Sequence, residues 1–122
     1  MKKSAAARPK SSPLMFRQGD VLLVAIAAIP PEAAAHQSQE RIVLAYGEVT
    51  GHAHAIAVEE AQEFRTKTPV PVFDWQAERF LQVEVKALLK HEEHSTIKIP
   101  AGRYAVVRQR EYSPAALRMV SD

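Results

Sequence analysis

The sequence predicts an all-β (mainly β) protein, a small single-domain barrel or sandwich. Short runs rich in β-branched and aromatic residues recur between turn residues, and no segment sustains the 3.6-residue period of an amphipathic helix. With 122 residues, of which 47% are hydrophobic, the chain can bury one core and is too short to divide comfortably into two. We expect a closed or nearly closed barrel, because regular short strands favour a barrel or sandwich over a βαβ sheet.

The first half of the domain supplies three predicted strands. Residues 21–26 form an apolar run that follows turn residues and ends at two prolines, which predicts a strand buried on both faces. Residues 31–39 predict a loop with one helical turn. A second strand is predicted over 41–46. Residues 52–58 alternate between alanine and larger side chains, so this third strand should pack its alanine face close against a neighbour.

The second half is predicted to hold an irregular stretch and then three strands. Residues 59–76 carry weak signals, and two prolines there favour an edge or an irregular excursion. Residues 78–85 predict a strand that the apolar residues after it can continue through a bulge. Residues 96–99 and 103–111 predict two strands of a hairpin, because Pro100-Ala101-Gly102 between them is typical of a turn.

The two ends of the chain differ from its body. Residues 1–15 predict a disordered basic N-terminal tail, because this stretch has four basic residues, no acid and few apolar residues. Residues 16–122 are then the single β-rich domain, and this domain is mildly acidic although the formal net charge of the chain is +2. Near the end, residues 113–117 predict a short C-terminal helical turn with Ser113 as its N-cap and proline in its first position.

Cysteine is absent from the chain. Disulfides, thiolate metal sites and cysteine nucleophiles are therefore excluded, and any metal ion must be bound by nitrogen and oxygen. No apolar run approaches the roughly 20 residues that span a bilayer, and the basic N-terminus is not followed by a signal-peptide core. We therefore expect a cytoplasmic protein without a membrane partner.

Four of the five histidines occur as two tight pairs. His52 and His54 stand at positions i and i+2 of a predicted strand, so both imidazoles point the same way, and Gly51 leaves space beside them. Taken alone, this pair is equally well interpreted as two half-exposed polar residues at the end of a strand. The other pair, His91 and His94, flanks two glutamates at the end of a strand. The separation of three positions does not fit the helical zinc-protease motif, which needs four.

The two histidine pairs predict a metal site. His52, His54, His91 and His94 are the candidate ligands of a divalent metal, Zn, Fe, Mn or Ni, among which the ligand types do not choose. Glu92 or Glu93 is a candidate ligand or catalytic acid/base, or a carboxylate that orients an imidazole.

A second candidate surface lies on the last predicted strand. Arg108, Arg110 and Tyr112 share one face there and could bind an anion or a nucleic-acid phosphate. The simpler interpretation is an exposed face whose arginines pair with acidic residues of the domain.

The chain resembles a family of short, uncharacterised bacterial proteins in three blocks. These are residues 17–24 (RQGDVLLV), residues 47–54 (GEVTGHAH), and HEEH at 91–94 leading to QREY at 109–112. The resemblance covers about residues 16 to 122 and implies no function, since none is assigned to that family.

The chain is also similar to the cupins, which are metal-binding β-barrels. Gly47, His52, His54 and Glu59 approximate the first cupin motif, although the gap between Gly47 and His52 is one residue shorter. Pro100-Ala101-Gly102 resembles part of the second motif. This resemblance implies a cupin-like barrel with a bound metal ion.

Three hypotheses follow from these observations. The first is a β-barrel protein that binds a divalent metal through the four histidines, with the question of enzymatic activity left open. The second is a non-catalytic accessory module that binds nucleic acid or a protein partner through the basic tail and the face of Arg108, Arg110 and Tyr112. The third makes the histidines a seam between copies of the chain in a homo-oligomer.

Overall fold

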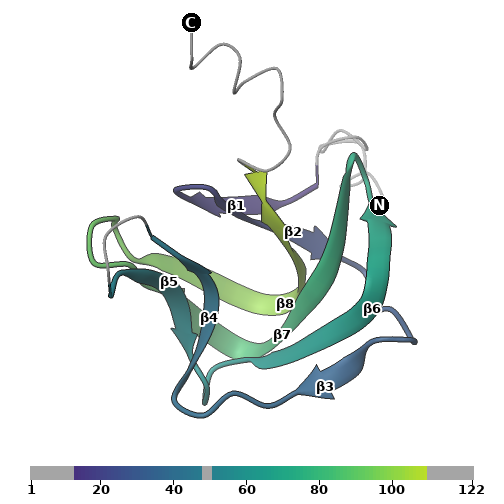
Figure 1. The fold of residues 1–122 in the computed structure, drawn as a ribbon, viewed down its shortest axis with the longest axis horizontal. Coiled ribbons are helices and arrows are strands. Elements are labelled where there is room, and N and C mark those ends of the chain that lie inside the picture. The colour runs from purple at the N-terminus through teal and green to yellow at the C-terminus, as the bar shows by residue number, and fades with distance from the viewer. Residues whose placement is uncertain (1–12, 48–50, 110–122) are drawn as a thin grey trace, which may run out of the picture.

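The computed structural model describes residues 13–47 and 51–109, and nearly all regular structure in these ranges is β (Figure 1). The predicted all-β class is confirmed, and no α-helix forms within the described ranges. The strands are β1 (Met15–Gln18), β2 (Val21–Ile26), β3 (Ala34–His36), β4 (Arg41–Tyr46), β5 (Ala53–Ala57), β6 (Gln62–Val72), β7 (Trp75–Leu89) and β8 (Ile97–Arg108).

The strands form two antiparallel sheets. The larger sheet has the order β1-β2-β8-β7-β6-β3, and β4 and β5 form a separate two-stranded sheet. A single bridge between Ala55 and Lys90 joins β5 to the chain just beyond β7. The expected closed barrel is wrong, because β1 and β3 remain the edges of the larger sheet. The β4-β5 hairpin is joined to the larger sheet by this backbone bridge and by hydrogen bonds from Arg79 of β7 to Leu44 O and Val43 O of β4, and it does not close the sheet.

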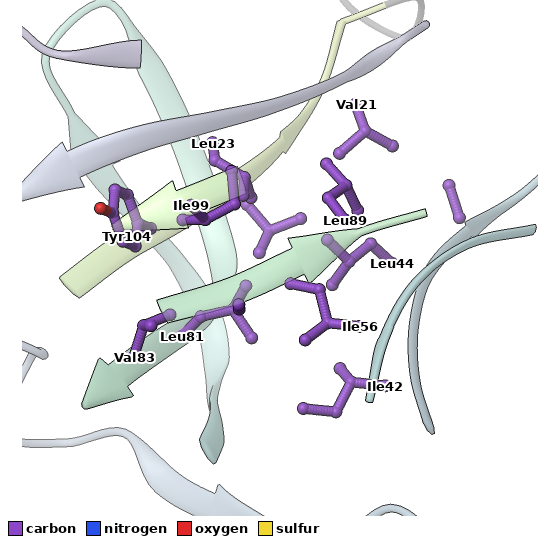
Figure 2. Close-up of a cluster of buried hydrophobic side chains, with 13 residues drawn as sticks. Val21, Leu23, Ile42, Leu44, Ile56, Leu81, Val83, Leu89, Ile99 and Tyr104 are labelled. Carbon is purple, nitrogen blue, oxygen red and sulfur yellow. The ribbon is translucent and has the colours of Figure 1, made fainter. Parts of the chain in front are cut away.

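The core lies between the β4-β5 hairpin and the larger sheet (Figure 2). Ile42, Leu44 and Ile56 of the hairpin face Leu81 and Leu89 of β7 there. A second cluster of buried apolar residues forms on the other face of the larger sheet. Residues 21–24 contribute alternately to the two clusters and are at most 3% exposed, which confirms a strand buried on both faces.

The expected turn at Pro100-Ala101-Gly102 is wrong, because β8 runs through it without a break. Pro100 pairs with Lys86 and Gly102 pairs with Val83, so two residues of β7 lie opposite one residue of β8. This arrangement is a β-bulge, which accommodates a proline and a glycine within a strand by displacing the regular pairing. The predicted continuation of β7 through a bulge is confirmed.

The segment between the first and second predicted strands also differs from expectation. Ala34–His36 pairs with Glu63–Arg65 as strand β3, so the expected helical turn over 31–39 is wrong. The expected edge or irregular excursion over 59–76 is wrong in the main, because β6 is an 11-residue strand between β7 and β3. Its pairing with β7 is irregular at one place, where the register shifts between Arg65 and Val70. The helical turn expected over 113–117, and the tail up to residue 12, lie outside the described residues.

Candidate metal centre

Two backbone hydrogen bonds bring the two histidine-bearing segments together. Ala55 N donates to Lys90 O at 3.0 Å, and Lys90 N donates to Ala55 O at 2.9 Å. His54 and His91 each stand one residue from this bridge, on neighbouring segments. Their rings lie side by side with centroids 4.3 Å apart. The predicted close packing of the alanine face is confirmed at Ala53 and Ala55, which are 1% and 5% exposed, but not at Ala57, which is exposed at the end of β5.

His54, His91 and His94 form the group that could hold a metal ion. One ring nitrogen from each lies within 4.8 Å of those of the other two. His94 contacts both partners, with ring centroids 5.5 Å from His54 and 4.8 Å from His91. His54 is 2% exposed, His91 is half-buried and His94 is exposed. The group therefore has a fixed, buried side at His54 and opens to solvent at His94.

Gln18 orients the buried imidazole. Its Nε2 donates to Leu89 O and Ser95 O, both at 2.9 Å, so its Oε1 must be the atom that lies 2.8 Å from His54 Nδ1. An amide oxygen can only accept, and His54 therefore carries a proton on Nδ1. In the neutral ring Nε2 then presents its lone pair. Burial is the main cause that lowers the pKa of His54, with the charge of His91 second, and this favours the neutral, metal-binding form.

The turn between β1 and β2 forms one wall of the site. Gly19 has a φ of +61°, and a Cβ there would lie 2.9 Å from His54 Cε1 and 3.1 Å from His94 Nε2. Only glycine leaves this space free at a backbone conformation that other residues rarely adopt. Next to it, Asp20 Oδ1 lies 3.7 Å from His54 Nε2, and Asp20 Oδ2 is paired with Arg108 Nη2 at 3.3 Å.

His91 and His52 lie on the other side of the group. His91 Nδ1 accepts a hydrogen bond from Glu93 N at 3.0 Å. His52 contacts His91 with ring centroids 5.8 Å apart, but it is not a member of the metal-capable group. Its Nδ1 lies 3.1 Å from Glu93 Oε2. All four predicted histidines thus lie in one cluster. Three of them form the metal-capable group, and His52 contacts that group without belonging to it.

The two glutamates support the loop and are not members of the metal-capable group. Glu92 Oε1 accepts a hydrogen bond from Ala53 N at 3.0 Å, and this bond is the main cause that lowers the pKa of Glu92. Glu92 therefore ties the loop of His91 and His94 to the start of β5. Glu93 faces His52, as described above. Glu59, expected from the cupin resemblance, lies in an exposed turn and is also outside the group.

The predicted anion-binding face is described only at Arg108. Its guanidinium pairs with Asp20, as the simpler interpretation of arginines paired with acidic residues of the domain anticipates. Arg110 and Tyr112 lie outside the described residues.

Sequence reasoning missed Gln18, Gly19 and Asp20 as parts of the site. The available signal is the block at residues 17–20, which predicts a turn before a strand and belongs to the first block of the family resemblance. Their proximity to the histidines depends on the pairing of β1 with β2 and of β2 with β8, and β2 and β8 lie near opposite ends of the domain in the sequence.

A family described as "Domain of unknown function (DUF8820)" matches residues 17–109. The chain belongs to the DUF8820 family. The DUF8820 match extends from β1 to the end of β8, so it includes the four clustered histidines and the turn of Gly19 and Asp20. It confirms the expected membership of an uncharacterised family, and its description states no activity. Neither the curated proteins nor the solved structures give a match. Within the described ranges, no helix could cross a membrane.

Proposed function

We propose that this protein binds one divalent metal ion through the imidazoles of His54, His91 and His94. The observation that supports the proposal is the convergence of three imidazole nitrogens within 4.8 Å of one another, around a ring whose tautomer Gln18 fixes. Imidazole is the commonest protein ligand for Zn²⁺ and suits Fe²⁺ and Ni²⁺ as well. His52 and Glu93 take a supporting role beside His91 in this proposal.

The geometry requires a modest closure on binding. Metal–nitrogen distances near 2.1 Å and tetrahedral angles place ligand nitrogens about 3.4 Å apart. The three nitrogens, which lie within 4.8 Å of one another, must therefore approach by up to about 1.4 Å. His94 can supply this movement, because it is exposed and lies outside the strands. His54 is held by Gln18 and serves as the fixed point.

Three imidazole ligands would leave at least one coordination position for water or a substrate. Such open sites support metal-assisted hydrolysis or redox chemistry, in contrast to closed structural sites with four protein ligands. The exposure of His94 places solvent beside the proposed ion. We propose an open metal site of this kind, with the reaction class left to experiment.

Elemental analysis and calorimetric titration of the untagged protein test this proposal. We expect one equivalent of Zn²⁺, Fe²⁺, Mn²⁺ or Ni²⁺ in the wild type and none in a His54→Ala/His91→Ala double variant. His36→Ala is the matched control, since His36 lies on β3 and is not a member of the group. A wild-type protein that binds none of the four ions would refute the proposal, as would a double variant that binds them normally.

A further inference from the structure

Asp20 stands directly in front of the nitrogen that His54 offers to a metal. Its Oδ1 lies 3.7 Å from His54 Nε2, and the carboxylate is one quarter exposed. We propose that Asp20 is a fourth protein ligand, bound through Oδ1, and that Arg108 positions it. This inference rests on the proposed three-histidine site and extends its ligand set from three nitrogens to three nitrogens and one oxygen. With this fourth ligand, a tetrahedral ion has no open position, and an open position remains only on an ion of five or six coordination.

Asp20 Oδ1 lies beside the ring nitrogen that His54 turns away from Gln18. Gln18 Oε1 contacts Nδ1 of His54 at 2.8 Å, so Nε2 is the ring atom left to bind a metal. Oδ1 lies 3.7 Å from this Nε2. Carboxylate oxygen and imidazole nitrogen are both common metal ligands, so one ion could bind both atoms.

The distance is close to that of a shared ion. Metal–nitrogen and metal–oxygen distances of about 2.0–2.2 Å with tetrahedral angles give a separation of about 3.4 Å. Oδ1 and Nε2, at 3.7 Å, would need to close by only about 0.3 Å. Asp20 is not a member of the group of His54, His91 and His94, so binding would also require Oδ1 to approach the ring nitrogens of His91 and His94.

The other oxygen and the backbone of Asp20 are anchored to the end of β8. Asp20 Oδ2 pairs with Arg108 Nη2 at 3.3 Å, and Asp20 O accepts a hydrogen bond from Gln109 N at 2.8 Å. Ligating carboxylates commonly use their second oxygen in this way, which fixes their orientation. Arg108 thus acts through Asp20, as a positioning residue.

Zinc affinity and the visible spectrum of the Co²⁺-substituted protein test this assignment. Asp20→Asn should weaken Zn²⁺ binding by about 10–100-fold and shift the Co²⁺ bands, because a neutral amide oxygen, a weaker ligand, replaces the negatively charged carboxylate. Arg108→Gln should weaken binding by about tenfold and leave the positions of the bands unchanged. Asp74→Asn, in the exposed turn between β6 and β7, is the matched control and should behave as the wild type.

The outcomes separate this inference from the proposal on which it rests. If Asp20→Asn retains the wild-type affinity and Co²⁺ spectrum while the His54→Ala/His91→Ala variant binds nothing, Asp20 is not a ligand and the three-histidine site stands. If the wild-type protein itself binds no metal ion, both the assignment of Asp20 and the three-histidine site are overturned. Asp20→Ser serves as a second variant, and the thermal midpoints of the metal-free proteins identify any variant that fails to fold.

Discussion

Replacement of Gln18 by alanine should both destabilise the domain and weaken metal binding. The side chain is 3% exposed, and its amide joins three segments through Leu89 O, Ser95 O and His54 Nδ1. Alanine removes all three hydrogen bonds at once. It also releases the ring of His54, which can then exchange its proton between the two nitrogens.

The size of the stability change follows from which partners remain buried. Leu89 is 0% exposed and His54 is 2% exposed, so two polar groups lose their partner inside the protein. Ser95 is exposed, and its carbonyl can turn to water. Each buried group without a partner costs about 1–3 kcal/mol, which predicts a loss of about 2–6 kcal/mol. The lower end applies if a water molecule enters the space.

Urea unfolding and zinc titration measure the two effects. We expect Zn²⁺ affinity to fall by about 10–100-fold in Gln18→Ala. Gln18→Glu keeps an acceptor for His54 and loses the donor to the two carbonyls, so it should be destabilised and yet bind Zn²⁺ better than Gln18→Ala. The exposed Gln37 provides the control substitution. Nitrogen NMR of the wild type at pH 8 reports which ring nitrogen of His54 carries the proton. A proton on Nε2 would refute the role of Gln18 in fixing the tautomer, and wild-type stability of Gln18→Ala would refute its role in the fold.

Three further predictions concern the turn and the buried ion pair. Gly19→Ala should lower the free energy of unfolding by about 1–2 kcal/mol, because alanine is strained at the left-handed backbone conformation of this position. It should also lower the metal content, because the new Cβ meets His54. Urea midpoints and metal contents equal to those of the wild type would contradict this. Arg79→Met should lower the free energy of unfolding by about 3–5 kcal/mol, because it removes a 2.6 Å bond to the fully buried side chain of Glu63. The double variant Arg79→Met/Glu63→Gln should regain part of this stability. Urea unfolding of both variants measures the two effects. Burial raises the pKa of Glu63, but the hydrogen bonds from Arg79 and Arg65 outweigh it and hold the pKa below 4.5. The stability from Glu63 is therefore present above pH 4.5 and is lost as pH falls through the lower, folded-state pKa; a Glu63→Gln urea profile with the same acid dependence as the wild type would refute this.

The strands could be predicted where the local pattern is strong. Val21–Ile26 and Arg41–Tyr46 begin and end as expected, because apolar β-branched runs bounded by turn residues have few alternatives. Ala34–His36 could not be predicted, since alanine has no strand preference and the segment becomes β only through its pairing with β6. The prediction of a turn at Pro100–Gly102 was wrong for a related reason. Its proline and glycine are local turn signals, but pairing with β7 absorbs them in a bulge.

The candidate site was predictable in part, for the same physical reason. The spacing of His52 and His54, and of His91 and His94, is visible in the sequence, and the structure places all four together. The division between them was not visible, because it depends on which ring contacts Gln18 and which contacts Glu93. Gln18 itself has no local signal. A buried glutamine becomes informative only when its three partners are known.

The arrangement of the three metal-capable histidines links the fold to the proposed chemistry. His54 lies in a strand and is held by a buried amide, so its position is set when the sheets pack. His91 and His94 follow β7 on a segment that Glu92 ties to the start of β5 through Ala53. One ligand is therefore rigid, and the others are restrained without being fixed. A site built in this way can close around an ion by the movement of a few residues, and it leaves the core beneath it unchanged.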